Sequence, residues 1–331
     1  MEKEELRLVF MGTPEFAVAT LRRLVEGGYN VVAVVTQPDK PVGRHQEQLQ
    51  PSAVKQFALA HGLPVLQPVK MKDPAFVEEL RGYKADLQVV VAYRMLPEVV
   101  WNMPRFGTFN VHAALLPQYR GAAPINWAVI NGETETGVTT FFLDKDIDTG
   151  RIIMQRRFPI PDEADVAYVY DGLMTLGADV AIETIDEILE STGNSEIKRV
   201  LFEGTEDLAL SAANELKPAP KIFKETCLID WNLPAKRVYD FIRGLSPYPG
   251  SWTNMEENGK QSVLKIFKTA KTSEDMQAEV GTVRSEKNRL YVRCGDAWLE
   301  ILELQMAGKK RMCARDFLNG MRDKSFRILT K

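Results

Sequence analysis

The sequence predicts a two-domain α/β protein, in which a doubly wound, mostly parallel sheet is followed by a small β-barrel. In the first half of the chain, strand-length runs rich in Val and Leu alternate with helical patterns, which is typical of a parallel sheet covered on both faces. In the second half, short β-type segments broken by Gly, Asn and Pro follow one another, as in a small barrel. The length of 331 residues is too great for one ordinary core and suits two domains.

A strand, a turn and a helix are expected at the start of the chain. Residues 6–11 are expected to form a buried strand, and a turn follows them. Thr13 suits the N-cap of the next helix, and Pro14 suits its first helical position. Gly27 and Gly28 are expected to end that helix.

The alternation continues through the rest of the first half. Strands are expected at residues 31–36, 64–66, 87–92, 108–112, 137–143 and 150–159, and helices at 52–61, 74–81, 124–131 and 164–189. The stretch 37–50 is expected to be a long polar loop. Residues 190–210 are polar and lack strong periodicity, so we predict a linker there, between domains at 1–189 and 211–331.

The second half is expected to hold one helix, at residues 235–243, among short strands. The strands are predicted at 227–230, 251–254, 263–269, 281–283, 290–294 and 298–306. Residues 209–331 hold 22 Lys and Arg against 15 Asp and Glu, a balance of +7, whereas residues 1–208 hold 20 against 30, a balance of −10. A basic half favours contact with nucleic acid, although such a charge is also common on a solvated surface.

The composition excludes several classes of protein. No apolar run approaches the roughly 20 residues that a membrane-spanning helix needs, and the charged N-terminus does not resemble a signal peptide. Cys227, Cys294 and Cys313 are far apart and odd in number, which argues against a disulfide framework and a zinc site. We therefore expect a soluble, cytoplasmic protein with no membrane partner and no metal.

The first turn argues against a nicotinamide cofactor. Its sequence, MGTPEF, differs from the GxGxxG pattern of dinucleotide-binding folds. Pro14 and Glu15 stand where small residues would let a pyrophosphate approach the backbone. The phosphate-binding pattern GxxxxGK[ST] is also missing from the sequence.

Asn110 and His112 are the first candidates for chemistry. They lie two residues apart at the end of the strand expected at 108–112, so alternation places them on one face of the sheet. Ligands of open α/β sheets bind outside the carboxyl ends of the strands. An amide and an imidazolium there could both donate hydrogen bonds to a developing oxyanion. The alternative, a structural core histidine, remains open on strand position alone.

Two further segments belong with this pair. Residues 115–124 form a compact loop with two prolines, one glycine and one cation before an expected helix. Asp146 and Asp148 precede Gly150 at the expected start of a strand. A carboxylate there could orient His112, favour its charged form or accept a proton, although acids beside glycine are also common turn formers.

Several segments together carry a family resemblance: MGTPEFA, TQPDKPVGR, VVVAYRMLP, NVHAALLPQYRGAAPI and IDTG. In this order and spacing they resemble the methionyl-tRNA formyltransferases, and SPYPGSW and AGKKRMCARDFL extend the resemblance over nearly the whole chain. The core pattern NxH…LLPxYRG…DTG alone is shared by the wider formyltransferase superfamily.

The resemblance implies a fold and a set of catalytic residues. The fold is a formyltransferase-like Rossmann variant, followed by a linker and an OB-like barrel. The catalytic positions carried over are Asn110, His112 and Asp148. Asn110 would donate to the formyl oxygen, and His112 would stabilise the oxyanion and help the folate nitrogen to leave. Asp148 would support His112 and take the proton of the attacking amine.

The resemblance also implies two binding partners, 10-formyltetrahydrofolate as co-substrate and initiator methionyl-tRNA. The folate-binding loop corresponds to Ala114, Leu115, Leu116 and Pro117. The family loop that contacts the acceptor end of tRNA corresponds to residues 37–50, with its arginine at Arg44. From the charge of the second half, we add Lys309, Lys310 and Arg311 as tRNA contacts, and we expect a monomer.

Three departures from the family pattern bear on binding. Ala113-Ala114 replaces the usual Gly-Ser after the catalytic histidine, which removes one hydroxyl. Gln118 replaces an arginine after the loop proline, and residues 45–48 replace lysines after Arg44. We therefore expect the 37–50 loop to bind phosphates more weakly than the corresponding loop of the family does.

The sequence disfavours two rival functions. A formyltransferase acting on a small amine is disfavoured, because the basic second half exceeds the short glycinamide ribonucleotide type and no further dehydrogenase-like domain of the nucleotide-sugar type is present in the sequence. A non-catalytic tRNA- or folate-binding protein is disfavoured by the complete set of Asn110, His112 and Asp148. Binding alone does not require all three.

Overall fold

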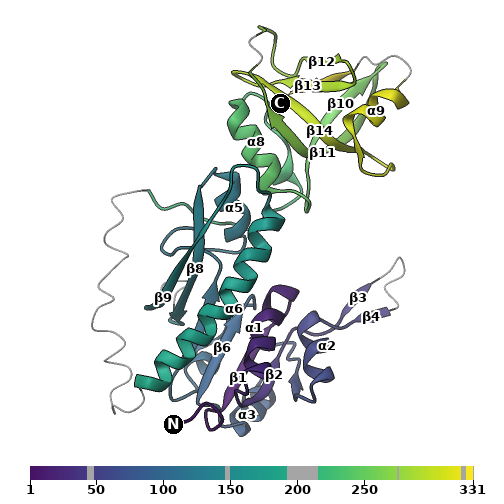
Figure 1. Cartoon of the computed structure of the whole chain (residues 1–331). Coiled ribbons are helices and arrows are strands. Elements are labelled where there is room, and N and C mark those ends of the chain that lie inside the picture. Colours follow the sequence, from purple (N-terminus) through teal and green to yellow (C-terminus); the bar gives the residue numbers. More distant parts are fainter. Residues whose placement is uncertain (43–47, 146–149, 192–214, 274–275, 322–325, 331) are drawn as a thin grey trace. The chain divides into compact units, whose positions relative to one another are not determined.

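The computed structural model describes residues 1–42, 48–145, 150–191, 215–273, 276–321 and 326–330 (Figure 1). The chain divides into two compact units. Unit 1 comprises Met1–Gly121, Thr136–Phe158 and Tyr170–Pro218, and unit 2 comprises Ala122–Glu135, Pro159–Val169 and Ala219–Lys331.

Unit 1 is built on a seven-stranded sheet. Its strands are β1 (Leu8–Gly12), β2 (Val31–Val35), β5 (Val65–Leu66), β6 (Leu87–Val91), β7 (Thr108–His112), β8 (Glu135–Phe142) and β9 (Ile152–Pro159). The order is β5-β2-β1-β6-β7-β8-β9; the pairings from β5 to β7 are parallel, and β8 runs antiparallel to β7. The predicted doubly wound, mostly parallel sheet is confirmed.

Helices cover both faces of this sheet. On one face, Val9 and Val90 share an apolar core with Phe76 and Leu80 of α3 (Pro74–Gly82) and with the short helix α4 (Glu98–Trp101). The remaining helices of unit 1 are α1 (Glu15–Glu26), α2 (Ala53–Ala60) and most of α6 (Val166–Ser191). β1 and β6 are buried along their whole length, as covered parallel strands must be.

The long helix α6 lies against the antiparallel side of the sheet (Figure 1). Gly177 faces the Val111 side chain of β7, and the hydroxyls of Thr184 and Thr140 lie 2.8 Å apart. Because Val111 points toward α6, its neighbours Asn110 and His112 point to the other face of the sheet.

The start of α1 differs from the prediction. Pro14 occupies the N-cap with an extended ψ of 174°, no side chain caps the helix, and helical residues begin at Glu15. Thr13 is therefore not the cap. The predicted end is correct, since Gly27 is the C-cap and Gly28 follows with φ +76°.

The stretch expected to be a long polar loop contains an antiparallel ladder. Its strands are β3 (Lys40–Val42) and β4 (Gln48–Gln50). At its base, Asp39 accepts hydrogen bonds from Lys55 Nζ at 2.7 Å and from Gln67 Nε2 at 2.7 Å. These two bonds, the one from Lys55 foremost, lower the pKa of the Asp39 carboxyl. Arg44 lies outside the described residues.

Unit 2 contains an antiparallel sheet that confirms the OB-like β domain. Its order is β12 (Val283–Glu286), β13 (Arg289–Arg293), β14 (Trp298–Met306), β11 (Lys260–Lys271), β10 (Ser251–Glu257) and β16 (Arg327–Leu329), with β15 (Met312–Cys313) beside β14. α8 (Ala235–Gly244) and α9 (Ala314–Gly320) share its apolar core. The strand expected at 227–230 is instead a 3-10 turn, Glu225–Cys227, followed by one bridge from Leu228 to Trp252.

Unit 2 also contains a helix from the first half of the chain, α5 (Pro124–Ile130). Asn126 Nδ2 donates to the Gly244 carbonyl at 2.9 Å, and Trp127 Nε1 donates to the Pro220 carbonyl at 2.8 Å. A Cβ atom at Gly244 would lie 2.6 Å from the Ile130 side chain, so α8 and α5 touch there without room for a larger residue.

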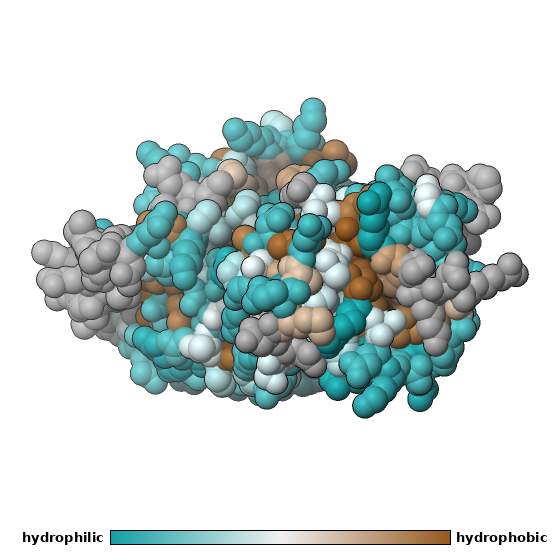
Figure 2. Space-filling view, turned by 90° about the horizontal axis from the view of Figure 1, so that it is seen from above, coloured by the Kyte–Doolittle hydropathy of each residue, from teal (hydrophilic) through white to brown (hydrophobic). Residues whose placement is uncertain are grey.

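None of the helices in the described ranges combines the length and apolar composition needed to cross a bilayer. The face of the molecule in Figure 2 is largely hydrophilic, and hydrophobic residues show in separate smaller areas.

Candidate active site

The strand β7 presents Asn110 and His112 where the sequence predicts them. Asn110 pairs with Val90 of β6, and His112 pairs with Thr139 of β8. The Asn110 side chain is half-buried, whereas His112 is only 6% exposed. An amide and an imidazole thus lie on one face at the carboxyl end of a central strand.

The imidazole of His112 has a main-chain partner. Its Nε2 lies 3.0 Å from the carbonyl oxygen of Tyr119, and its ring meets that of Phe141 edge-on with centroids 6.4 Å apart. A carbonyl oxygen can only accept, so Nε2 carries a hydrogen in this arrangement. The third residue of the predicted set, Asp148, lies outside the described residues.

The loop Ala114–Pro117 directly follows this strand and is held by β8 and β9. The hydroxyl of Thr139 donates to the Ala114 carbonyl at 2.6 Å and accepts from the Leu116 N–H at 3.1 Å. Gln155 Nε2 donates to the Leu116 carbonyl at 2.8 Å and to Thr139 Oγ1 at 2.9 Å. Thr139 and Gln155 are residues that sequence reasoning missed, because no local motif marks them.

A glycine lets this loop approach β8. A Cβ atom at Gly137 would lie 2.5 Å from Leu115 Cδ2, closer than real contacts allow. Ala114 is fully buried and Leu116 nearly so, whereas Leu115 and Pro117 are half-buried. The main-chain groups of Ala114 and Leu116 are thus engaged within the protein, and the loop is fixed in place.

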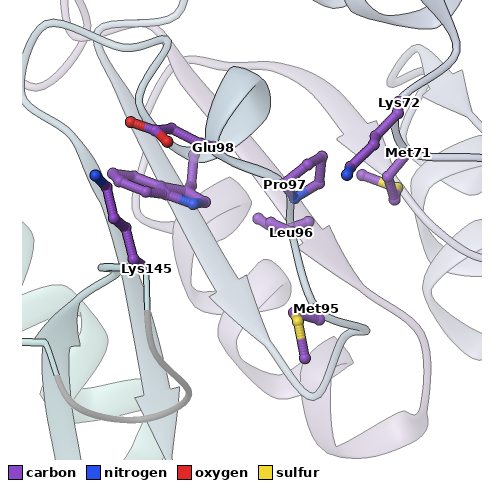
Figure 3. A pocket seen from close by; sticks show the side chains of 8 residues that line it. Met71, Lys72, Met95, Leu96, Pro97, Glu98 and Lys145 are labelled. Atoms are coloured by element: carbon purple, nitrogen blue, oxygen red, sulfur yellow. The ribbon is translucent and has the colours of Figure 1, made fainter.

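A pocket of about 420 Å³ lies beside the segment that follows β6 (Figure 3). This size falls within the range of small-molecule sites. Its lining comes from Met71, Lys72, Met95, Leu96, Pro97, Glu98, Trp101 and Lys145. Lys145 directly precedes residues 146–149 in the sequence, which include Asp148 and lie outside the described residues.

Tyr93 and Arg94 directly precede the part of the pocket lining at residues 95–98, and both contact residues 68–71. Arg94 donates to the carbonyls of Val69, at 2.9 Å, and of Pro68. The Tyr93 hydroxyl lies 3.6 Å from Met71 Sδ, and burial raises the pKa of that hydroxyl. The pocket is a mainly apolar site with three charged groups, Lys72, Glu98 and Lys145, at its walls.

The predicted basic cluster lies in unit 2, at the turn between β14 and β15. Lys309, Lys310 and Arg311 are all exposed. Arg311 Nε donates to Glu303 at 2.7 Å, and its guanidinium lies 4.4 Å from the centroid of the Phe267 ring. The positive charge of Arg311 is therefore paired with the Glu303 carboxylate.

In the part of the chain that the structure describes, no three His, Cys, Asp or Glu side chains gather so that they could hold a metal ion. At the first turn, a Cβ atom at Gly12 would lie 2.6 Å from the Ala17 Cβ, so tight packing of α1 on β1 accounts for this glycine. The expectations of no metal and no nicotinamide stay predictions.

Comparison with known proteins places the chain among formyltransferases. The family model for formyl transferases matches residues 6–185, and that for the formyl transferase C-terminal domain matches residues 221–322. Methionyl-tRNA formyltransferase from Parabacteroides distasonis is 59% identical over 324 residues, which is 97% of this chain and 98% of that protein. The enzyme of the same name from Porphyromonas gingivalis is 48% identical over 325 residues, 97% of each chain.

A solved structure shares the fold. The N-formyltransferase from Helicobacter canadensis, solved with folinic acid and dTDP-3-aminofucose, matches with a TM-score of 0.61 at 18% identity. The match covers 93% of this chain and all of that one.

Proposed function

The chain belongs to the methionyl-tRNA formyltransferase family, and from this premise we propose how its residues perform the reaction. It transfers the formyl group of 10-formyltetrahydrofolate to the free amino group of initiator methionyl-tRNA. The product is N-formylmethionyl-tRNA for translation initiation.

The reaction is an acyl transfer in which the substrate supplies its own nucleophile. The methionyl amine attacks the formyl carbon, a new C–N bond forms, and the formyl oxygen becomes an oxyanion. The bond to the folate nitrogen then breaks; that nitrogen gains a proton, and the amine loses one. No serine or cysteine nucleophile is required, so the protein has to stabilise the oxyanion and move two protons.

We assign these tasks to Asn110, His112 and Asp148. The Asn110 amide donates to the oxyanion, and His112 in its protonated form stabilises the same charge and delivers a proton to the folate nitrogen. Asp148 supports His112 and accepts the proton of the amine. The observation that carries the assignment is the placement of Asn110 and His112 on one face of β7, next to the fixed loop at residues 114–117.

Formyl-folate is assigned to the loop Ala114–Pro117 and the 420 Å³ pocket. A flat heterocycle suits a cavity with an indole, Trp101, and apolar walls. The Glu98 carboxylate can accept from the amino group of a pteridine ring, while Lys72 and Lys145 can attract carboxylates of the folate tail.

The proposal is tested by incubating the purified protein with formyl-labelled 10-formyltetrahydrofolate and charged initiator tRNA. The expected product is N-formylmethionine on the tRNA. Parallel reactions with an aminosugar nucleotide and with glycinamide ribonucleotide are expected to give no product. Transfer to either small amine at a comparable rate would contradict the assigned substrate.

Replacing Thr139 with valine tests how the folate loop is held. The change keeps the side-chain shape but leaves the Ala114 carbonyl and the Leu116 N–H without their hydroxyl partner. We expect a loss of about 1–3 kcal/mol in the free energy of unfolding and a several-fold rise in the KM for formyl-folate. Thr136→Val on the same strand is the control, because the buried Thr136 hydroxyl makes no hydrogen bond within the described residues. Equal effects of the two changes would contradict this role of Thr139.

Transfer RNA is assigned to Arg44 and to the basic second half. Residues 1–189 supply the formyl-folate chemistry, residues 190–210 the link, and residues 211–331 the phosphate contacts. The first two residues of this link are the end of α6, and residues 192–210 lie outside the described residues. The protein acts as a monomer in the cytoplasm, where translation initiates. Because Arg311 is already paired with Glu303, Lys309 and Lys310 contribute more to phosphate binding.

Changing Lys309 and Lys310 together to serine is expected to weaken the salt dependence of tRNA binding. Each lost phosphate contact lowers the slope of log Kd against log salt by about 1, and the KM for tRNA rises while kcat changes little. Arg311→Met is the control and should change the slope less. Salt titrations with identical slopes for the wild type and the double variant would show that these lysines do not touch RNA.

A further inference from the structure

A short segment, residues 217–219, runs along the loop that follows the folate site; we call it the strap. The Lys217 N–H donates to Gln118 Oε1 at 2.8 Å, and the Lys217 carbonyl accepts from the Tyr119 N–H at 2.7 Å. The Ala219 carbonyl accepts from the Ala123 N–H at 3.2 Å. The strap thus bonds to the loop at two residues, to the side chain of Gln118 and to the main chain of Tyr119.

Tyr119 has an unusual backbone that needs such support. Its φ is +59°, in the left-handed region that is unfavourable for a residue with a side chain. Its ring is only 5% exposed, its N–H bonds to the strap, and its carbonyl faces His112 Nε2 at 3.0 Å. Burial of the side chain and the bond to the strap therefore fix the carbonyl that accepts from the imidazole.

We propose that Tyr119, through its main-chain carbonyl, and Gln118, through its bond to the strap, are positioning residues that hold His112 with a hydrogen on Nε2. The proposal rests on the catalytic role of His112 given above. It also gives the strap, far along the sequence, a part in setting the geometry of His112.

The chemistry follows from what a carbonyl can do. The Tyr119 oxygen only accepts, so Nε2 keeps its hydrogen in both charge states of the ring. When the imidazolium acts as an acid, one ring N–H bond breaks, the proton goes to the folate nitrogen, and the neutral ring that is left keeps a hydrogen on Nε2. The carbonyl dipole also stabilises the charged ring, as an acceptor behind a catalytic histidine does in other acyl transferases.

A second histidine provides an internal reference for the opposite tautomer. His61 Nδ1 lies 2.9 Å from the Phe57 carbonyl, so its hydrogen is expected on Nδ1. The chain contains only three histidines, so their signals are few enough to assign by substitution. His112→Asn identifies the signal of the candidate catalytic ring.

The test is a long-range proton–nitrogen NMR spectrum of the ¹⁵N-histidine-labelled full chain, above about pH 8, where imidazoles are neutral. The wild-type spectrum is expected to show His112 as the Nε2–H tautomer and His61 as the Nδ1–H tautomer. A wild-type His112 in the Nδ1–H form, or in an even mixture, overturns the proposal. This readout does not depend on activity, so it distinguishes failure of the proposal from failure of the proposed function.

Two variants test the part played by Gln118. Gln118→Leu removes the acceptor of the Lys217 N–H, and Gln118→Glu keeps an oxygen there. Gln118→Leu is expected to reduce the Nε2–H population of His112 and to lower kcat by about tenfold, with little change in the KM for formyl-folate, because small misplacements of a catalytic group are costly. Gln118→Glu is expected to retain the Nε2–H signal.

Each other result counts against the role of Gln118. An unchanged kcat and tautomer in Gln118→Leu overturns it. A lower kcat with an unchanged tautomer also overturns it, since the residue then acts on the fold and not on His112. Lys217→Pro, which removes the same hydrogen bond from the other side, should reproduce the Gln118→Leu spectrum, with Lys217→Ala as the control that keeps the N–H.

Discussion

Asn110→Ala is expected to lower kcat for formylation by about 10²–10³-fold, and His112→Ala by a similar factor. Each change removes one donor to the oxyanion; Asn110 is half-buried and His112 is 6% exposed, so the rates are compared for variants shown to be folded. Because both act on the same charge, the double variant should lose less than the product of the two single losses. Steady-state rates with saturating formyl-folate and tRNA give these factors.

The control for this prediction is an asparagine in a different sheet. Asn254 is half-buried on β10 of unit 2, so Asn254→Ala makes the same chemical change away from the candidate site. Its kcat should match that of the wild type. A folded Asn110→Ala protein with near-normal kcat would remove Asn110 from the mechanism.

Asp240→Ala is expected to cost about 3–5 kcal/mol in the stability of unit 2. Asp240 is 2% exposed, and its carboxylate accepts from Lys236 Nζ at 2.6 Å and from Arg243 Nε at 2.8 Å. Arg243, also buried, donates further to the Ala164 carbonyl at 2.9 Å. Removing the carboxylate leaves a buried guanidinium without its counter-charge, which is why the loss is large.

Urea denaturation measures this loss, with tryptophan fluorescence as the signal, because Trp231 and Trp298 are fully buried in unit 2. The control is Glu303→Ala, which breaks the exposed pair with Arg311 and should cost about 0–1 kcal/mol. If the two variants unfold at the same urea concentration, the Asp240 carboxylate does not stabilise unit 2 as argued.

The sequence predicts the central strands of the sheet well because most of their residues are buried. β7 begins and ends at the predicted residues, and alternation along it correctly separates the core-facing Val111 from Asn110 and His112. β14 also matches its predicted bounds. In both strands, contact with neighbouring strands and helices reinforces the local pattern, so the pattern alone suffices.

Prediction fails where local preference competes with tertiary contact. Thr13 is a good N-cap by residue type, yet the backbone stays extended through Pro14. The 37–50 stretch is mostly polar, so its composition does not indicate the β3–β4 ladder. The helix α9 was not predicted, although Phe317 and Leu318 bury its apolar side.

The candidate site, too, can be predicted from the sequence only in part. Asn110, His112 and the loop Ala114–Pro117 could be found from the sequence, because they are contiguous and belong to a recognisable pattern. Thr139 and Gln155 could not, since they reach the loop from other strands through hydrogen bonds that no spacing encodes. The pocket residues come from three separate segments, at 71–72, 95–101 and 145, which only folding brings together.

A single-turnover experiment tests the central claim most directly. Wild-type protein and His112→Ala, each loaded with formyl-labelled 10-formyltetrahydrofolate, are mixed with charged initiator tRNA, and the appearance of labelled N-formylmethionine is followed in time. The account predicts equal formyl-folate binding by the two proteins and transfer about 10²–10³-fold slower in His112→Ala. Equal transfer rates in the two folded proteins, or no labelled N-formylmethionine from the wild type, would contradict it.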